Sequence, residues 1–161
     1  MNAIDMLEQQ HREVAALFDQ LADAQSFSSR RKAFERVADA LVVHTTLEER
    51  HFYPSVRRRA TEQILLESLE EHLAMKRLLA DLLELRPDDD VFAAKLKVLR
   101  DEVEHHVDEE ERDLFPAVRK LFEAAALIEI GKAMATTRAQ LVAAGSPRVA
   151  VTAETERAAP L

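Results

Sequence analysis

The chain has 161 residues, and 30 acidic against 22 basic residues give it a net charge of −8. This length is enough for one domain with a hydrophobic core. With 2 glycines and 5 prolines the chain has too few turn residues for a β-sandwich or barrel, and without cysteine it has no disulfide, thiolate metal site or cysteine nucleophile. Hydrophobic residues at 47% and charged residues at 32% are typical of long amphipathic helices.

The charge and the first residues also limit the partners and the compartment. A net charge of −8 argues against binding the phosphate backbone of a nucleic acid, and the single basic run, residues 57–59, is predicted at a helix end or a turn. The first residues carry Asp5 and Glu8 and lack a basic stretch followed by an apolar one, so no signal peptide is predicted. We expect a cytoplasmic protein that binds neither nucleic acid nor a membrane.

Apolar residues recur at steps of three and four along most of the chain, which predicts helices. Four long helices are predicted in this way, at about 2–24, 29–53, 61–86 and 90–115. The sequence SFSS offers serine N-caps before the second helix, and PDDD forms the turn before the fourth. Pro54 and Pro116 are each expected to stop or kink the helix that precedes them.

Joined by short turns, these helices predict an all-α fold, an up-down-up-down four-helix bundle over residues 1–122. A further helical stretch at about 117–144 predicts an additional C-terminal helix, assigned to residues 123–145, that caps the bundle or forms a homodimer. Residues 146–161 have no helical stripe and hold two of the 5 prolines, so we expect a loose, disordered tail.

Residues 44–57 (HTTLEERHFYPSVR) and 106–119 (HVDEEERDLFPAVR) form an internal repeat with an offset of 62 residues and 7 identical positions of 14. Each copy carries a histidine followed four residues later by a glutamate, and a lone histidine precedes each copy. The six residues are His11, His44, Glu48, His72, His106 and Glu110. Because residues four apart share a helix face, the two side chains of each copy point to one spot.

These six residues fall on the apolar stripes of their helices, so all six are expected to face the interior of the bundle. The midpoints between consecutive histidines fall at residues 27.5, 58 and 89, inside the three predicted turns, which places the four histidines at one level. A single histidine on an apolar stripe is more often a hydrogen-bonded core residue than a ligand. Burying four histidines and two glutamates together without partners would lower the stability of the fold by several kcal/mol per charge. This group therefore predicts a metal site.

The number of ligands indicates two metal ions. Two octahedral ions offer about twelve coordination positions, of which four imidazoles and two bridging carboxylates fill about eight, leaving room for bridging solvent and a small exchangeable ligand. One tetrahedral zinc ion would leave two of the six residues unused, and magnesium or calcium prefers oxygen ligands. Mixed imidazole and carboxylate ligands with open positions favour iron, with manganese, or zinc acquired during expression, as second choices.

The order of these residues resembles the hemerythrin-like family, also called the HHE cation-binding domain, over about residues 1–122. The motif is a histidine, then HxxxEE followed by FYP, a second lone histidine, then HxxxEE followed by LFP. The resemblance implies a four-helix bundle that holds two iron ions as an oxo- or hydroxo-bridged non-haem di-iron centre, with the six residues above as ligands. Oxygen carriers of the family have HxxxH in the third helix and HxxxxD in the fourth. Here Lys76 follows His72 by four residues, so the chain resembles sensor-type and bacterial single-domain members more closely.

The sequence leaves open the roles of several other polar residues near these six. Glu111 replaces Glu110 only if the fourth helix is distorted. His51 is expected to form hydrogen bonds at the bundle end, with direct ligation as the alternative, and Tyr53 either packs or donates to bound peroxide. His105 is expected on the surface with Glu109, and Glu8 and Lys76 are expected on solvated faces, with a place at the edge of the site as the alternative.

Several functions fit such a centre. The leading prediction is a di-iron protein that binds dioxygen, peroxide or nitric oxide, with catalase-like decomposition of peroxide as a candidate activity. The alternative is an iron or oxygen sensor without turnover, in which the added helix and tail respond to the metal. A ferritin-like carboxylate oxidase is a weaker alternative, because its ExxH pairs, found here at 8–11, 48–51 and 102–105, would leave His44, His72 and His106 unused.

Overall fold

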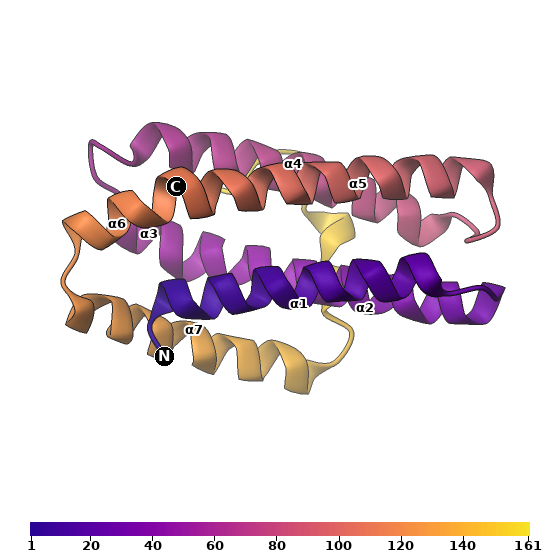
Figure 1. Cartoon of the computed structure of the whole chain (residues 1–161), viewed down its shortest axis with the longest axis horizontal. Coiled ribbons are helices and arrows are strands. Elements are labelled where there is room, and N and C mark those ends of the chain that lie inside the picture. The colour runs from indigo at the N-terminus through magenta and orange to yellow at the C-terminus, as the bar shows by residue number, and fades with distance from the viewer.

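The computed structural model describes residues 1–161 and is entirely helical, with no strand. Four of its five long helices make up the bundle, namely α1 (Ala3–Asp23), α2 (Phe27–Leu47), α4 (Glu62–Glu84) and α5 (Asp90–Glu109). They run side by side with neighbours antiparallel and form the predicted four-helix bundle (Figure 1). None of the helices combines the length and the apolar character needed to cross a bilayer.

Side chains just before three of these helices explain where the helices begin. The Asn2 side chain accepts a hydrogen bond from the Asp5 backbone N–H at 3.1 Å, and the Asp89 side chain accepts one from Val91 at 2.8 Å. Ser26 caps α2 by accepting from the Ser29 backbone N–H at 3.0 Å. These contacts satisfy backbone donors that have no partner inside the helix, as the SFSS and PDDD turns predicted.

The two copies of the repeat each contain one turn of π-helix. These wide turns are η1 (Glu48–Phe52) and η2 (Glu110–Leu114), followed by α3 (Tyr53–Val56) and α6 (Phe115–Leu121). Pro54 and Pro116 do not stop the helices, because the chain stays helical through both, and each helix instead departs from the α form at the π turn before the proline. A π turn shifts the hydrogen bonds by one residue and so relieves the clash that a proline ring makes with the preceding turn.

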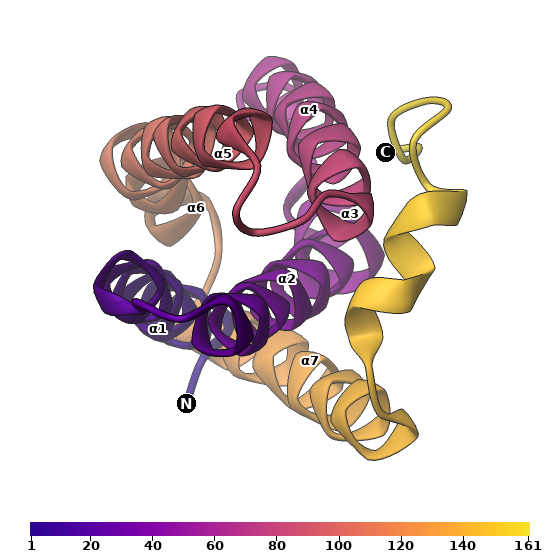
Figure 2. The same ribbon diagram turned by 90° about the vertical axis from the view of Figure 1, so that its right-hand side faces the viewer.

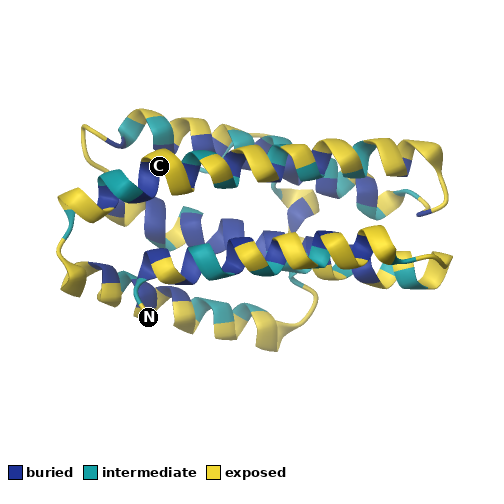
Figure 3. Ribbon diagram, viewed as in Figure 1, coloured by how far each residue is buried: buried dark blue, intermediate teal, exposed yellow.

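Buried residues line the inside of the bundle (Figure 3), and the apolar ones form two clusters. One contains Leu7, Leu47 and Leu69, and the other contains Leu41 and Leu79 together with further residues of all four helices. Along α1, α2 and α4, and along α5 with its continuation η2, the predicted histidine lies between residues of one cluster and residues of the other. The bundle therefore holds a polar layer between two apolar ones.

The additional helix, α7 (Ala124–Ala144), packs outside the bundle along α1 and α2 (Figure 2). The predicted stretch at 117–144 is interrupted at Phe122, whose backbone is extended with φ −126° and ψ 136°. A Cβ on Gly131 would come within 2.8 Å of the Met1 carbonyl oxygen, so the glycine allows α7 to approach the N-terminal end of α1. A homodimer through this helix stays a prediction.

The C-terminal segment, expected to be a loose tail, instead packs on the outer side of α2 and α4 (Figure 2). Residues Pro147–Ala153 form a 3₁₀-helix, η3, whose Val151 is fully buried. The Arg148 guanidinium donates to Asp39 at 2.8 Å, and Arg77 donates to the Thr155 carbonyl oxygen at 2.9 Å. The sequence did not show this because contacts of arginine with single carboxylates and backbone carbonyls leave no periodic pattern.

Candidate metal centre

The six residues predicted as ligands come together in the polar layer. Each is buried, with His11 the most accessible at 5% exposure and Glu48, His72 and Glu110 at 0%. They form two groups able to hold a cation, which share one glutamate. The groups are His11, His44, Glu48 and Glu110, and Glu48, His72 and His106.

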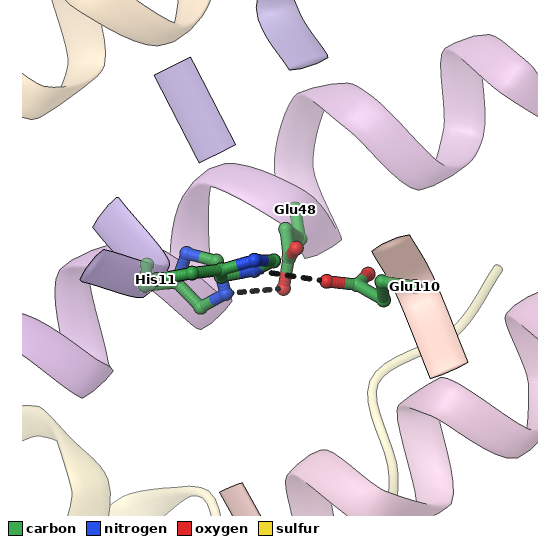
Figure 4. Close-up of side chains that lie close together, drawn as sticks. His11, Glu48 and Glu110 are labelled. Carbon is green, nitrogen blue, oxygen red and sulfur yellow. Dashed lines mark ion pairs between the residues drawn. The ribbon is translucent and has the colours of Figure 1, made fainter. Parts of the chain in front are cut away.

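The first group joins α1, α2 and the two π turns. His11 Nε2 lies 3.2 Å from Glu110 Oε2, and His44 Nε2 lies 3.3 Å from Glu48 Oε2. Figure 4 shows the side chains of His11, Glu48 and Glu110 pointing toward one another. The two carboxylates stand at the first residue of each π turn, so the local widening of the helices occurs where the site is formed.

The second group joins α4 and α5 to Glu48, and its His106 also lies near Glu110 of the first group. His72 Nε2 lies 3.1 Å from Glu48 Oε2, and His106 Nε2 lies 3.6 Å from Glu110 Oε2. The Nε2 atoms of His72 and His106 are 3.2 Å apart. All four Nε2 atoms thus face one small volume between the two carboxylates.

The other ring nitrogen, Nδ1, of each histidine faces an acceptor outside this volume. The pairs are His11 with Glu111 at 2.8 Å, His44 with Gln10 at 3.0 Å, His72 with Glu49 at 2.9 Å and His106 with Glu71 at 3.0 Å. A ring that donates its Nδ1–H to an acceptor leaves the lone pair of Nε2 free, which is the state a metal ligand needs.

The outer partners follow the internal repeat. Glu49 and Glu111 are the second glutamates of the two HxxxEE motifs, and each serves the lone histidine of the other half. Gln10 and Glu71 directly precede the two lone histidines. Sequence reasoning missed three of these partners, although their equivalent places in the repeat were a signal that could have found them.

Several buried polar atoms at the centre have no hydrogen-bond partner. They are His11 Nε2, His44 Nε2, Glu48 Oε1 and Glu110 Oε2. A buried acceptor without a partner costs about 1–3 kcal/mol, and more when it is charged. Four such atoms, from two imidazoles and two carboxylates, are the donor set that a divalent transition-metal ion binds, so the residues fit the predicted metal.

Tyr53 adds a phenol to the second group. Its side chain is fully buried, and its hydroxyl donates to Glu110 Oε1 at 2.8 Å and lies 3.2 Å from His72 Nε2. The equivalent residue of the second copy is Phe115, whose ring stacks on His11 with centroids 5.8 Å apart. At this pair of positions the two halves of the centre therefore differ by one hydroxyl group.

The remaining residues left open by the sequence lie outside the centre. His51 Nε2 contacts the Thr137 hydroxyl at 2.7 Å, and the exposed His105 lies beside Glu71 and Glu109 as a surface residue. Glu8 pairs with Arg119 at 2.8 Å. Lys76 was expected on a solvated face, but it is buried with 5% exposure because Glu49 and Glu154 neutralise it. His51 and His105 belong to two of the three ExxH pairs that a ferritin-like site would use, and both lie outside the centre.

Comparison with known families agrees with this arrangement. The family model for the hemerythrin HHE cation-binding domain matches residues 2–118. This chain belongs to the hemerythrin HHE family. The match covers the four long helices and both π turns, so the family resemblance of the motif is confirmed.

Relatives of this HHE domain differ in length. A Nostoc protein named DNA nickase is 32% identical over 119 residues, which are 74% of this chain but 34% of that protein, so the chain spans about a third of this relative. Uncharacterised proteins of Mycobacterium tuberculosis and Mycobacterium bovis are 30% identical over 149 residues and are matched over 90% of their length. A crystal structure of an HHE domain-containing protein from Mycobacterium kansasii shares the fold, with a TM-score of 0.81 at 24% identity over 94% of this chain and 97% of that one.

The charges of the HHE centre are unevenly distributed in the absence of metal. Burial lowers the pKa of His44 to about 3 against the opposing effect of Glu48. Burial alone would raise the pKa of Glu48, but the surrounding imidazoles, led by His44, hold it well below its usual range. Burial and the neighbouring Glu48 raise the pKa of Glu110. One carboxylate is thus held ionised while the other retains a proton more readily.

A groove between α1 and α5 leads to the HHE centre. A cavity of about 250 Å³ reaches His11 and is lined near the surface by Ala15 and Glu111. A smaller cavity of about 10 Å³ lies further in, between His11, His44 and His106 and apolar side chains that include Leu41 and Met75. It is large enough for about one water-sized molecule, so a ligand that enters by this groove has to be small.

Proposed function

We propose that this HHE domain binds two iron ions at the six predicted residues and binds dioxygen, peroxide or nitric oxide there. The orientation of the four histidines is the observation that carries the proposal. Each ring directs Nδ1 toward an acceptor outside the centre and Nε2 into the centre. His11 and His44 would hold one ion and His72 and His106 the other. Glu48 belongs to both groups, and Glu110 of the first group lies 3.6 Å from His106, so both carboxylates would serve the two ions.

Iron is preferred to other metals because of the donor set. Four imidazoles and two carboxylates match a borderline transition-metal ion, and two such ions keep open positions for a small ligand. Manganese at the same residues and zinc acquired during expression are the competing occupants. When bound, iron supplies one-electron redox chemistry that the side chains themselves lack.

The protein's own groups support decomposition of peroxide as the candidate reaction. Tyr53 holds a proton 2.8 Å from Glu110 Oε1, and burial together with Glu110 raises the pKa of Tyr53 well above its ordinary value. The phenol therefore stays protonated at neutral pH, and rotation of its hydroxyl away from Glu110 would let it donate to a ligand at the centre. The apolar side chains of the inner cavity exclude bulk water and admit a small neutral molecule.

An experiment on protein from iron-replete cells tests this proposal. Two irons per chain, a near-ultraviolet absorption band of ferric iron and oxygen evolution after addition of hydrogen peroxide are expected. If the protein binds iron but evolves no oxygen, the result would favour carriage or sensing of a ligand over turnover of peroxide. A chain that takes up no iron would contradict the proposal.

The sensor alternative has one specific observation in its favour. The C-terminal segment contacts the surroundings of His72, because Glu154 lies 3.3 Å from Lys76, which pairs with Glu49. Metal-dependent movement of this segment would be read by hydrogen exchange of residues 147–161 with and without iron. Faster exchange in the iron-free protein, combined with no turnover of peroxide, is the expected signature of a sensor.

Cleavage of DNA is not part of the proposal. The Nostoc relative named DNA nickase is about three times as long as the shared region, and this chain carries a net charge of −8. A surface of that charge repels the phosphate backbone, so the proposed ligands are small molecules.

A further inference from the structure

The internal repeat relates two sides of the metal centre, which we call its flanks: the surroundings of His11 with its partner Glu111, and those of His72 with its partner Glu49. The flanks differ in the residue that follows the lone histidine by four positions. Four residues after the first lone histidine stands Ala15, and four residues after the second stands Lys76. Residues four apart lie on the same helix face, so both positions flank a lone histidine on the side of its outer partner. Ala15 is exposed, whereas Lys76 is buried.

On the His72 side, charged groups close the flank. The Lys76 ammonium lies 2.9 Å from Glu49, whose carboxylate accepts from His72 Nδ1 at 2.9 Å. Glu154 of the C-terminal segment contacts the same ammonium at 3.3 Å. A hollow of about 260 Å³ beneath this segment reaches Glu49 and Lys76 but touches no histidine. His72 itself is 0% exposed.

On the His11 side, the equivalent flank is open. Glu111, which corresponds to Glu49 in the repeat, has a side chain that is 44% exposed, compared with 11% for Glu49. The cavity of about 250 Å³ bordered by Ala15 reaches the His11 ring, and its residues His11, Val14 and Val103 also line the inner cavity. An alanine leaves space here that a lysine side chain fills on the other flank.

We propose that Lys76 and Glu154 close one of two related flanks, so that, of these two, small ligands reach the centre through the α1–α5 groove beside Ala15. Lys76 is in addition a positioning residue, because it fixes the carboxylate of Glu49 that orients His72. This inference rests on the proposed function for the identity of the ligand, but the difference in access concerns the protein alone.

The first test closes the open flank. In the Ala15→Lys variant the new ammonium can pair with Glu111 as Lys76 pairs with Glu49, and Ala15→Met adds similar bulk without charge. Nitric oxide, a neutral probe, is mixed with the reduced iron-loaded protein and followed by visible absorption. Association is expected to slow by about tenfold in both variants, with dissociation slowed equally and Kd unchanged. Ala16→Lys, at the next exposed position, is the matched control and keeps the wild-type rate.

The second test opens the closed flank. Lys76→Ala combined with Ala15→Lys is expected to recover most of the association rate that Ala15→Lys alone loses. Glu154→Ala, whose side chain is 38% exposed in the native protein, serves the same purpose if the first change lowers iron content. The two double variants thus combine Ala15→Lys with either Lys76→Ala or Glu154→Ala. Slow association of nitric oxide in both of them would overturn the proposal, and so would a wild-type association rate in Ala15→Lys alone.

A third measurement needs no iron and separates this inference from the proposed function. Diethyl pyrocarbonate acylates accessible imidazoles, and mass spectrometry of the metal-free protein locates the modification. His11 is expected to react faster than His72, Ala15→Lys to protect His11, and Lys76→Ala to expose His72. Equal reaction of both histidines in the native chain would overturn the inference, whereas a protein that binds no iron but shows this difference would contradict only the proposed function.

Discussion

The Nε2 atoms of His72 and His106 lie 3.2 Å apart inside the bundle. Both rings direct Nδ1 toward a carboxylate, Glu49 at 2.9 Å and Glu71 at 3.0 Å. If both rings are neutral with the proton on Nδ1, two lone pairs face each other in the buried interior of the bundle. Such an arrangement is unfavourable unless a proton or a cation lies between the nitrogens. A bound metal ion therefore removes an internal cost of the folded chain.

The first prediction is that ferrous iron stabilises the protein against heat. A ligand that binds only the folded state at about a hundred times its Kd adds about 2.7 kcal/mol per site. For a chain of this size that corresponds to about 5–10 °C in Tm. Anaerobic thermal unfolding followed by circular dichroism, with and without a chelator, measures the change. Magnesium is the control, and an equal shift with magnesium would contradict a site made of imidazoles.

The second prediction concerns the outer partner of His106. Glu71→Gln keeps an acceptor oxygen for His106 Nδ1, as Gln10 does for His44 in the other half, so iron affinity is expected to stay close to wild type. Glu71→Ala removes the acceptor and is expected to weaken iron binding by about 10–100-fold. Competition with a chromophoric chelator gives both affinities. Identical losses in the two variants would indicate that charge, rather than orientation of the ring, is what Glu71 provides.

The third prediction is a dependence of iron affinity on pH. Burial lowers the pKa of His72 and His106, but hydrogen bonds and charges of the nearby carboxylates outweigh it and raise both pKa values. The metal-free protein therefore keeps protons on these rings at pH values where free imidazole has lost them, and iron must displace those protons. Affinity is expected to fall as the pH drops from 8 to 6, with protons released on binding. Calorimetry in buffers of different ionisation enthalpy measures the release, and no proton release at pH 7 would contradict the assignment.

The fourth prediction separates metal binding from chemistry at Tyr53. Tyr53→Phe removes the hydroxyl that donates to Glu110 and makes the residue equivalent to Phe115 of the other half. Iron content is expected to remain at the wild-type level, while any decomposition of peroxide slows by about a hundredfold or more, as for loss of a proton donor. The matched change Phe122→Tyr, at a half-buried site outside the centre, leaves the rate unchanged. A Tyr53→Phe protein with full activity would show that the phenol only packs.

The common height of the four histidines along the bundle axis could be predicted, because it depends only on how many residues separate each histidine from the neighbouring turn. Helix rise is constant, so residues equidistant from a short turn end at the same height, and His11, His44 and His72 follow this rule. The apolar stripes likewise indicated which face of each helix is buried. Both properties are encoded locally, and the bundle that they predict is the one observed.

The outer partners and the C-terminal segment could not be predicted in the same way. Whether Gln10 reaches His44 or Glu71 reaches His106 depends on how neighbouring helices rotate about their axes, which the period of the sequence does not specify. The burial of Lys76 depends on Glu154, 78 residues further along the chain, and no local pattern reports such a contact. The repeat did contain a signal, since equivalent positions serve equivalent histidines.

The most direct test of the account is the iron content of three proteins purified side by side from iron-replete cells. The wild-type chain is expected to carry two irons, and His105→Ala, a change at a surface ring that is 62% exposed, is expected to carry the same. His72→Ala removes an imidazole at the centre and is expected to carry well below two. Equal iron in His72→Ala and His105→Ala, or no iron in the wild-type chain, would contradict the claim that the buried histidines and glutamates hold the metal.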